Sequence, residues 1–199
     1  MCENIDRGIG LYLEKLASMG ELENTIIVFS SDHGEMLGDH GRWGKSVPYH
    51  PSASVPMIVA GPGIRRGAAS AALVSIMDLA ATFLDYADTP VPKEMDSRSF
   101  RPLLEGKTEN HRDVVFSGLG AWRLAFDGQY KVITGFNPKI ARIGDDWTPS
   151  SKEVEGVQTL VFDLSQDPYE NKDLFQEMPS AAGKLLEKLS SSAHAASGG

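Results

Sequence analysis

Two adjacent side chains with metal-ligand chemistry, Asp32 and His33, directly follow an apolar run at residues 25–29. A carboxylate and an imidazole that leave one buried strand can both turn toward a single cation, and this donor pair suits a hard or borderline divalent metal. Taken alone, the Asp-His-Gly triplet fits a helix N-cap aspartate followed by a loop histidine at least as well. The pair is therefore a candidate metal site that needs support from its surroundings.

A long glycine-rich segment, residues 36–50, follows this pair and contains three further candidate site residues, Lys45, His40 and His50. A loop of this length without periodicity is more often functional than filler. The commonest role of a loop lysine is nevertheless a solvated one. For His40, packing in the loop with hydrogen bonds to backbone is an equal alternative to a place in a binding cleft.

The elements around these residues predict an α/β core. Apolar residues recur at helical spacing over residues 5–16, and the β-branched run at 25–29 is typical of a strand covered on both faces, as in a parallel sheet. A second core strand is predicted at 55–60, followed by a helix from Ser75 or Asp78 to residue 84. Polar side chains after the first strand would lie at the strand end where open α/β sheets bind ligands.

Beyond residue 100 the sequence changes to short strands separated by turns. An exposed excursion is predicted at 137–158 and a closing helix at 174–189, with a frayed tail from Ser190. Asp127-Gly128 is typical of a hairpin turn between two of the strands. The candidate strands lie at residues 114–116, 122–126, 130–133 and 160–164.

The predicted fold class is α/β: part of a mixed, mostly parallel sheet with flanking helices, followed by a small antiparallel sheet subdomain and a C-terminal helix. We expect the α/β part to span residues 1–110, the subdomain residues 111–190 and a flexible tail residues 191–199. A chain of 199 residues with 41% hydrophobic content can bury a core of this kind.

Composition argues against several classes of partner. The formal net charge is −8 and like charges form no blocks, which disfavours nucleic acid and anionic membrane surfaces. No apolar run is long enough to span a bilayer. Cys2 is the only cysteine, so neither an internal disulfide nor a thiolate metal cluster can form, and the compartment stays open. Small molecules or neutral partners are therefore favoured.

Four motifs at fixed spacing carry a family resemblance. They are Ser-Asp-His-Gly-Glu at 31–35, Gly-Asp-His-Gly at 38–41, Trp-Gly-Lys at 43–45 and Val-Pro-Met-Ile-Val-Ala-Gly-Pro-Gly at 55–63. Together they resemble the sulfatase family of the alkaline phosphatase superfamily, in particular arylsulfatases and choline sulfatases. Residues 162–174 are similar to the closing motif of that family.

The resemblance implies roles for individual residues. Asp32 and His33 correspond to the second pair of metal ligands around a divalent cation, calcium by preference with manganese as the alternative. Lys45 corresponds to the lysine that contacts the sulfate, and His40 and His50 become candidates for substrate binding. Attack on a sulfate ester moves charge onto the bridging oxygen, so a metal and an ammonium around it stabilise the transition state. The implied substrate is a small-molecule or carbohydrate sulfate ester.

Two parts of the family's site have no counterpart in this sequence. The nucleophile of the family is a formylglycine made from a Cys-x-Pro-x-Arg motif, whereas Cys2 is followed by Glu-Asn-Ile. The first pair of metal ligands, aspartates near the N-terminus in the family, is also missing. We therefore expect a C-terminal portion of a longer enzyme, inactive by itself, whose partner is the N-terminal half. Exposure of the strands at 25–29 and 55–60 would then favour self-association.

The matched region departs from the family pattern at residues 49–56. Relatives tend to read Tyr/Phe-Glu-x-Ser-x-Arg-Val-Pro there, and this chain has His50 and Ser54 in place of the acid and the arginine. Loss of both charges as a unit leaves no orphan charge to bury. Altered substrate choice is the other explanation. A phosphonate or phosphate ester hydrolase of the same superfamily, and a non-catalytic binding fragment, are the alternative functions.

Overall fold

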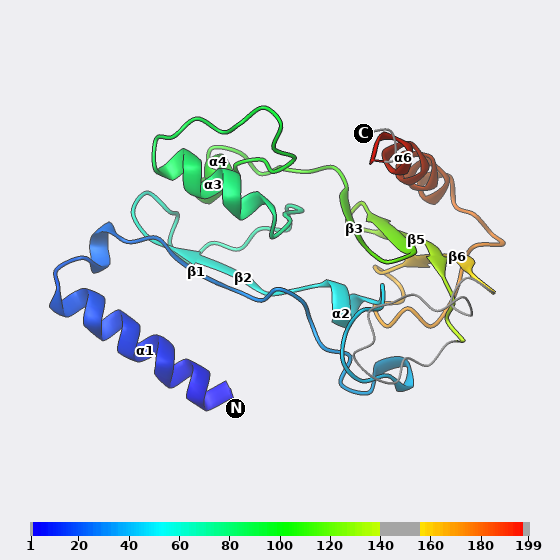
Figure 1. Ribbon diagram of the computed structural model, residues 1–199, viewed down its shortest axis with the longest axis horizontal. Helices are drawn as coiled ribbons and strands as arrows, with labels where there is room; N and C mark the ends of the chain where they lie inside the picture. Colours follow the sequence, from blue (N-terminus) through cyan, green and yellow to red (C-terminus); the bar gives the residue numbers. More distant parts are fainter. Residues whose placement is uncertain (1, 140–155, 197–199) are drawn as a thin grey trace. The chain divides into compact units, whose positions relative to one another are not determined.

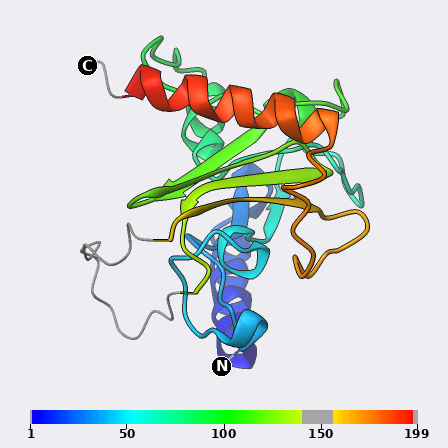
Figure 2. The same cartoon turned by 90° about the vertical axis from the view of Figure 1, so that its right-hand side faces the viewer.

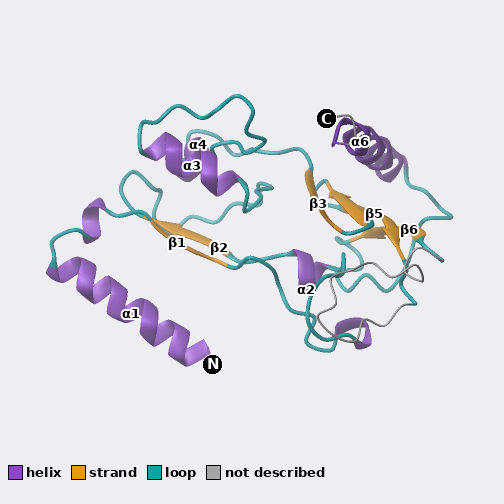
Figure 3. Cartoon of the chain, in the orientation of Figure 1, coloured by secondary structure: helices purple, strands orange, loops and turns teal. Residues whose placement is uncertain are grey.

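The computed structural model describes residues 2–139 and 156–196, which form two compact units (Figure 1). The first unit comprises Met1–Ser30, Pro56–Ala71 and Ile76–Glu109, and the second comprises Ser31–Val55, Ala72–Ser75 and Asn110–Gly199. The α/β class is confirmed, because helices and strands both contribute to the fold (Figure 3). No helix among the described residues is both long and apolar enough to cross a bilayer.

The first unit begins with helix α1 (Cys2–Ser18), as the apolar spacing predicts. Gly20 ends it in the left-handed conformation, with φ of 73°, and the N–H groups of Gly20 and Glu21 donate to carbonyls of the last turn. This is the usual way a glycine stops a helix. None of the side chains of α1 is buried.

Strands β1 (Ile27–Ser30) and β2 (Met57–Ala60) follow the 3₁₀ turn η1 (Leu22–Asn24) and pair antiparallel, with Phe29 opposite Ile58. The expected parallel arrangement is therefore wrong for these two strands. Phe29 is 40% and Ile58 62% exposed, which agrees with the exposure expected for these strands in a C-terminal portion. A continuous apolar run indicates that a strand suits a buried place, but it does not encode the direction of the neighbouring strand.

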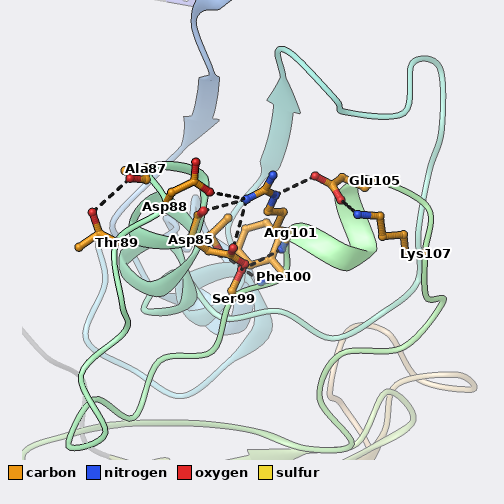
Figure 4. A network of polar contacts seen from close by, with 10 residues as sticks. Asp85, Ala87, Asp88, Thr89, Ser99, Phe100, Arg101, Glu105 and Lys107 are labelled. Carbon is orange, nitrogen blue, oxygen red and sulfur yellow. Dashed lines mark hydrogen bonds and ion pairs between the residues drawn. The ribbon is translucent and has the colours of Figure 1, made fainter.

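Helices α3 (Asp78–Tyr86) and α4 (Arg101–Leu104) complete the first unit. Asp78 is fully buried and its carboxylate accepts from the backbone N–H of Arg98, which ties the approach to α4 to the start of α3. Phe100 is 1% exposed, and its backbone N–H donates to the hydroxyl of Thr82. Figure 4 shows the charged residues that join the ends of the two helices around Arg101.

The second unit is a four-stranded antiparallel sheet in the order β3 (Val115–Leu119), β4 (Trp122–Phe126), β5 (Tyr130–Phe136) and β6 (Gln158–Asp163). All four predicted strands and the hairpin turn are confirmed. The carboxylate of Asp127 accepts from the N–H groups of Gln129 and Tyr130, which closes that turn. Most of the predicted excursion, residues 140–155, lies outside the described residues.

Helix α6 (Ser180–Ala196) covers one face of this sheet (Figure 2). The helix was predicted over 174–189, so its predicted start and end are both wrong. Pro179 disfavours helical backbone at the preceding residue, and Met178 has φ of 32°, so the helix begins only at Ser180. The predicted tail is helical as far as Ala196. The buried side chains between helix and sheet are Ala125, Val132, Val161, Ala182, Leu185 and Leu189.

Residues 31–55 pack against the opposite face of the sheet. This segment contains the 3₁₀ turn η2 (Asp39–Gly41) and the short helix α2 (His50–Ala53). Its buried side chains Met36, Val47 and Tyr49 join a core cluster that the sheet completes with Trp122, Leu124, Ile133, Phe136, Leu160 and Phe162. The segment that carries the candidate site residues is thus built into the second unit (Figure 2).

Candidate functional site

The loop that carries Lys45 is held by backbone contacts and by one tryptophan. The carbonyl of Gly44 accepts from Met36, whose side chain is 1% exposed, and the carboxylate of Glu35 accepts from the N–H of Gly44 at 2.5 Å. The indole N–H of Trp122 donates to the carbonyl of Ser46 at 3.1 Å. Ser46 has φ of 78°, a strained conformation for a residue with a side chain. Lys45 therefore lies between two residues, Gly44 and Ser46, whose backbones are both held by hydrogen bonds.

Residues 31–34 are held closely against α2. The N–H of Gly34 donates to the carbonyl of Ser52 at 2.9 Å, and a Cβ atom on Gly34 would lie 1.9 Å from the carbonyl oxygen of Pro51. No side chain larger than hydrogen fits there. The hydroxyl of Ser31 donates to the carbonyl of His33 at 2.6 Å, which folds the chain around the histidine.

His33 and Lys45 meet directly, with 2.7 Å between Nε2 of the ring and Nζ of the lysine. The ring's Nδ1 lies 2.8 Å from the carbonyl oxygen of Gly34. A carbonyl can only accept, so Nδ1 carries the proton and Nε2 presents its lone pair to the ammonium of Lys45. An imidazole whose Nδ1–H is held by a backbone carbonyl while Nε2 faces a cation has the orientation that metal-ligating histidines adopt.

Asp32 lies beside this pair, with its Oδ2 at 3.5 Å from Nε2 of His33 and its side chain 83% exposed. Desolvation by its neighbours opposes ionisation, but interactions with the His33 ring, backbone N–H donors and the Lys45 ammonium outweigh it, so the pKa of Asp32 is lowered. The carboxylate is therefore ionised at neutral pH. One carboxylate and one neutral imidazole are then available to a cation on the same side of the loop.

This donor set fits a divalent metal, but it supplies only part of a coordination sphere. Within residues 2–139 and 156–196, no group of three or more His, Cys, Asp and Glu side chains is arranged to hold a metal ion. Calcium ordinarily takes about six to eight oxygen ligands. Asp32 and His33 would have to be joined by ligands from elsewhere.

The structure places the other two predicted site residues apart from this contact. His40 stacks on Tyr49, with 3.9 Å between ring centroids and 12° between the planes. The backbone N–H of His50 donates to a carboxylate oxygen of Glu170 at 2.6 Å. Partial burial of the ring and the positive charge of Lys131 lower the pKa of His50. Roles for His40 and His50 in substrate binding stay predictions.

Two residues that the sequence analysis did not single out join this segment to the sheet. Glu170 and Lys131 form a buried ion pair, with 2.6 Å between Nζ and Oε1 and side-chain exposures of 3% for Lys131 and 0% for Glu170. Glu170 lies in the closing motif at 162–174, so the motif was visible in the sequence. Its contact with position 50 spans 120 residues and carries no local signal.

Comparison with known proteins identifies the class to which this fold belongs. Residues 1–89 match the family model described as Sulfatase. The chain is 29% identical over 194 residues to an arylsulfatase of Clostridium perfringens. The aligned region covers 93% of this chain and 37% of that protein. Among solved structures, the chain superposes on BT4656 in complex with its substrate D-glucosamine-2-N,6-O-disulfate, with a TM-score of 0.78 and 28% identity. The superposed region covers 94% of this chain and 38% of that one.

A second solved structure shows how widely the fold is shared. A phosphonate monoester hydrolase of Agrobacterium radiobacter has a TM-score of 0.73 at 23% identity, over 96% of this chain and 39% of that chain, which shows the fold alone. These are folds of the alkaline phosphatase superfamily. The chain is similar to the sulfatase family of that superfamily, whose model matches residues 1–89, and it corresponds to the C-terminal part of the members it matches. It spans about a third of the length of the curated relatives.

Proposed function

We propose that the chain supplies part of the sulfate-ester site of a sulfatase, with Lys45, His33 and Asp32 as its functional side chains. The observation that carries this proposal is the contact between Nε2 of His33 and Nζ of Lys45 at 2.7 Å. It brings an ammonium and the lone pair of a potential metal ligand to one point, next to the ionised carboxylate of Asp32. A sulfate group that replaced this direct contact would lie between a bound cation and the lysine.

Asp32 and His33 would hold the divalent cation, calcium by preference and manganese as the alternative. A bound cation supplies positive charge beside the sulfate oxygens. The Gly34 carbonyl keeps the proton on Nδ1 of His33 and so keeps Nε2 free for the metal. Lys45 places its ammonium near the bridging oxygen, where negative charge develops as the bond to sulfur breaks.

The remainder of the site would come from the N-terminal half of the sulfatase fold, which provides the formylglycine nucleophile and the first metal ligands. Support comes from the length of the relatives, of which this chain covers about a third, and from the incomplete donor set within the described residues. We call the assembly of this chain with that half the complete enzyme. A carbohydrate sulfate ester is the proposed substrate class, because BT4656 binds a sulfated glucosamine.

Substitution of Lys45 in the complete enzyme tests the proposal. The ammonium contributes more in the transition state than in the ground state, so Lys45→Ala should lower kcat by about a hundred- to a thousandfold with a smaller change in KM. Lys45→Arg should recover little activity, since a planar guanidinium cannot place a compact charge at the same point. Steady-state kinetics on an aryl sulfate measure both effects.

Two results would contradict the proposal. Turnover of Lys45→Ala within a fewfold of the unmodified enzyme would show that Lys45 is a solvated loop lysine. A higher kcat/KM for an aryl phosphonate monoester than for the matched aryl sulfate would show that the site serves the alternative ester class. Lys172→Ala, which removes an exposed lysine from a surface ion pair with Glu177, is the matched control and should leave both substrates unaffected.

A further inference from the structure

Glu170 is a buried carboxylate whose two oxygens contact different parts of the second unit. Its residue is 2% exposed. Oε1 lies 2.6 Å from Nζ of Lys131 on β5, and Oε2 accepts from the backbone N–H of His50 at 2.6 Å. Hydrogen bonds to an ionised acceptor are shorter and stronger than neutral ones. The carboxylate thus joins the sheet to the first residue of α2.

The backbone at Glu170 is strained. Its φ of 56° lies in the left-handed region, where glycine would be free of strain and a glutamate is not. The turn that imposes this conformation is held by the N–H of Glu170 on the carbonyl of Asp167 and by the N–H of Lys172 on the Asp167 carboxylate. A glutamate at a position that favours glycine indicates that its side chain is needed there.

Stability alone does not explain the buried pair. Burial lowers the pKa of Lys131 and the charge of Glu170 opposes that effect, so removal of the pair from water is costly. A hydrophobic pair of the same volume is often as stable as a buried ion pair or more so. What the ionic pair provides in addition is an acceptor fixed in space for the N–H of His50.

That N–H is linked to the proposed sulfate site through short contacts. Helix α2 begins at His50, and its Ser52 carbonyl accepts from Gly34. The backbone at Gly34 allows no Cβ against Pro51, and its carbonyl orients the ring of His33. A displacement of α2 would therefore move the ring that meets Lys45.

We propose that Glu170 is a positioning residue for the sulfate site, which sets the place of His33 relative to Lys45 by anchoring the N–H of His50 to Lys131 of the sheet. The assignment of that site rests on the proposed function. The positioning itself is a property of this chain and can be measured without turnover.

The test compares two double variants that both remove the buried charges. Lys131→Met with Glu170→Gln keeps a side-chain oxygen for the N–H of His50, and Lys131→Met with Glu170→Leu does not. Nitrogen-15 NMR of the histidine rings in this chain reports the tautomer of His33. We expect the Gln pair to keep the Nδ1–H form and the Leu pair to show mixed tautomers. Identical His33 signals in the two pairs would overturn the proposal.

A second comparison leaves the ion pair intact, and it decides the question where the Leu pair fails to fold. His50→Pro removes the backbone N–H together with the ring, and Tyr49, with φ of −67° and ψ of 152°, already has the backbone that precedes a proline. His50→Ala keeps the N–H and removes the ring. The proposal requires that His50→Pro alone disturbs the His33 signals, and an effect of the same size in His50→Ala contradicts it.

Kinetics of the complete enzyme separate this proposal from the proposed function. The Leu pair should lose on the order of a hundredfold in kcat relative to the Gln pair, because misplacement of catalytic groups by about an ångström has this effect. Glu177→Gln, an exposed carboxylate, is the control that should leave kcat unchanged. If the His33 signals are disturbed in the Leu pair but neither the unmodified enzyme nor any variant hydrolyses a sulfate ester, only the proposed function is contradicted. Equal kcat in the two pairs would contradict the positioning role.

Discussion

Gly34 separates His33 from Glu35 at the point where the backbone of α2 comes closest. Its N–H donates to Ser52, and the carbonyl oxygen of Pro51 occupies the space that a methyl group would need. Both neighbours are backbone atoms, so neither can move aside by changing a rotamer. The orientation of the His33 ring depends on this close packing of Gly34 against α2, because the Gly34 carbonyl holds the ring.

We therefore expect Gly34→Ala to displace residues 31–35 from α2. Overpacking of this kind costs about 1–3 kcal/mol of the free energy of unfolding. Urea denaturation followed by circular dichroism measures that cost, and histidine NMR reports whether the His33 ring has moved. Gly41→Ala is the comparison, because nothing lies within 4 Å of its Cβ position; its φ of 65° adds backbone strain without a clash. An unchanged His33 signal in Gly34→Ala would contradict this account.

The candidate residues themselves could be found from the sequence because their signal is local. Asp32 and His33 are adjacent, and Lys45 follows at fixed spacing within the same segment. Glu170 and Trp122 could not be found in that way, since they meet the segment only through the tertiary fold. A motif identifies the groups that do chemistry, whereas the groups that hold them in place are defined by contacts between distant residues.

At the scale of elements, the ends of α3 and α4 are joined by Arg101 (Figure 4). Its guanidinium donates to the carboxylate of Glu105 at 2.8 Å and to the carbonyl of Asp85 at 2.8 Å, and it lies over the ring of Tyr86 at 4.7 Å. The side chain is 31% exposed, so solvent screens part of its electrostatic interaction. The side-chain hydrogen bond to Glu105 is the main reason that the pKa of Arg101 is raised.

Arg101→Met should loosen the two helices while it keeps apolar contact with Tyr86. We expect weaker protection of α3 amides, measured by hydrogen exchange, and only a modest effect because the charges are partly screened. The difference from the unmodified chain should shrink at high salt. Lys172→Met, which breaks the surface pair with Glu177, is the control, with an expected change below about 0.5 kcal/mol. Equal protection of α3 in both variants would contradict the role of Arg101.

The elements differ in how well the sequence predicts them. The strands at β3 to β6 and helix α1 follow from periodicity and turn residues, because each pattern reports a local preference. The antiparallel pairing of β1 with β2 and the late start of α6 do not. The direction of the β1–β2 pairing depends on which strand lies alongside β1. The start of α6 depends on the left-handed backbone at Met178 together with Pro179. The packing of residues 31–55 on the antiparallel sheet was also not predicted.

At the scale of the whole molecule, the proposed site is divided between this chain and the rest of the sulfatase fold. The 199-residue chain should therefore show no turnover of an aryl sulfate, with or without added calcium or manganese. Its affinity for calcium should be weak, since Asp32 and His33 leave most coordination positions to water. Isothermal titration measures that affinity. Clear metal-dependent turnover by the chain alone would contradict the division of the site.

The two-stranded sheet of the first unit exposes an apolar surface that we call the strand patch, made of Phe29 and Ile58. The two residues lie directly opposite each other in the antiparallel register, so their side chains share one face. Phe29 is 40% and Ile58 is 62% exposed. Exposed apolar patches and unpaired strand edges favour association with other chains. In the complete enzyme we propose that the N-terminal half covers this surface.

The isolated chain should accordingly self-associate through the strand patch. Light scattering at increasing protein concentration should show a rising mean mass, because burial of apolar surface favours association. Phe29→Thr with Ile58→Thr should shift that rise to higher concentration while the β-branched side chains preserve the strands. Tyr169→Ser, which removes an aromatic ring that is 70% exposed in the second unit, is the matched control and should leave the mass curve unchanged. A strictly monomeric chain at every concentration would contradict the prediction, and an equal effect of Tyr169→Ser would place the association elsewhere.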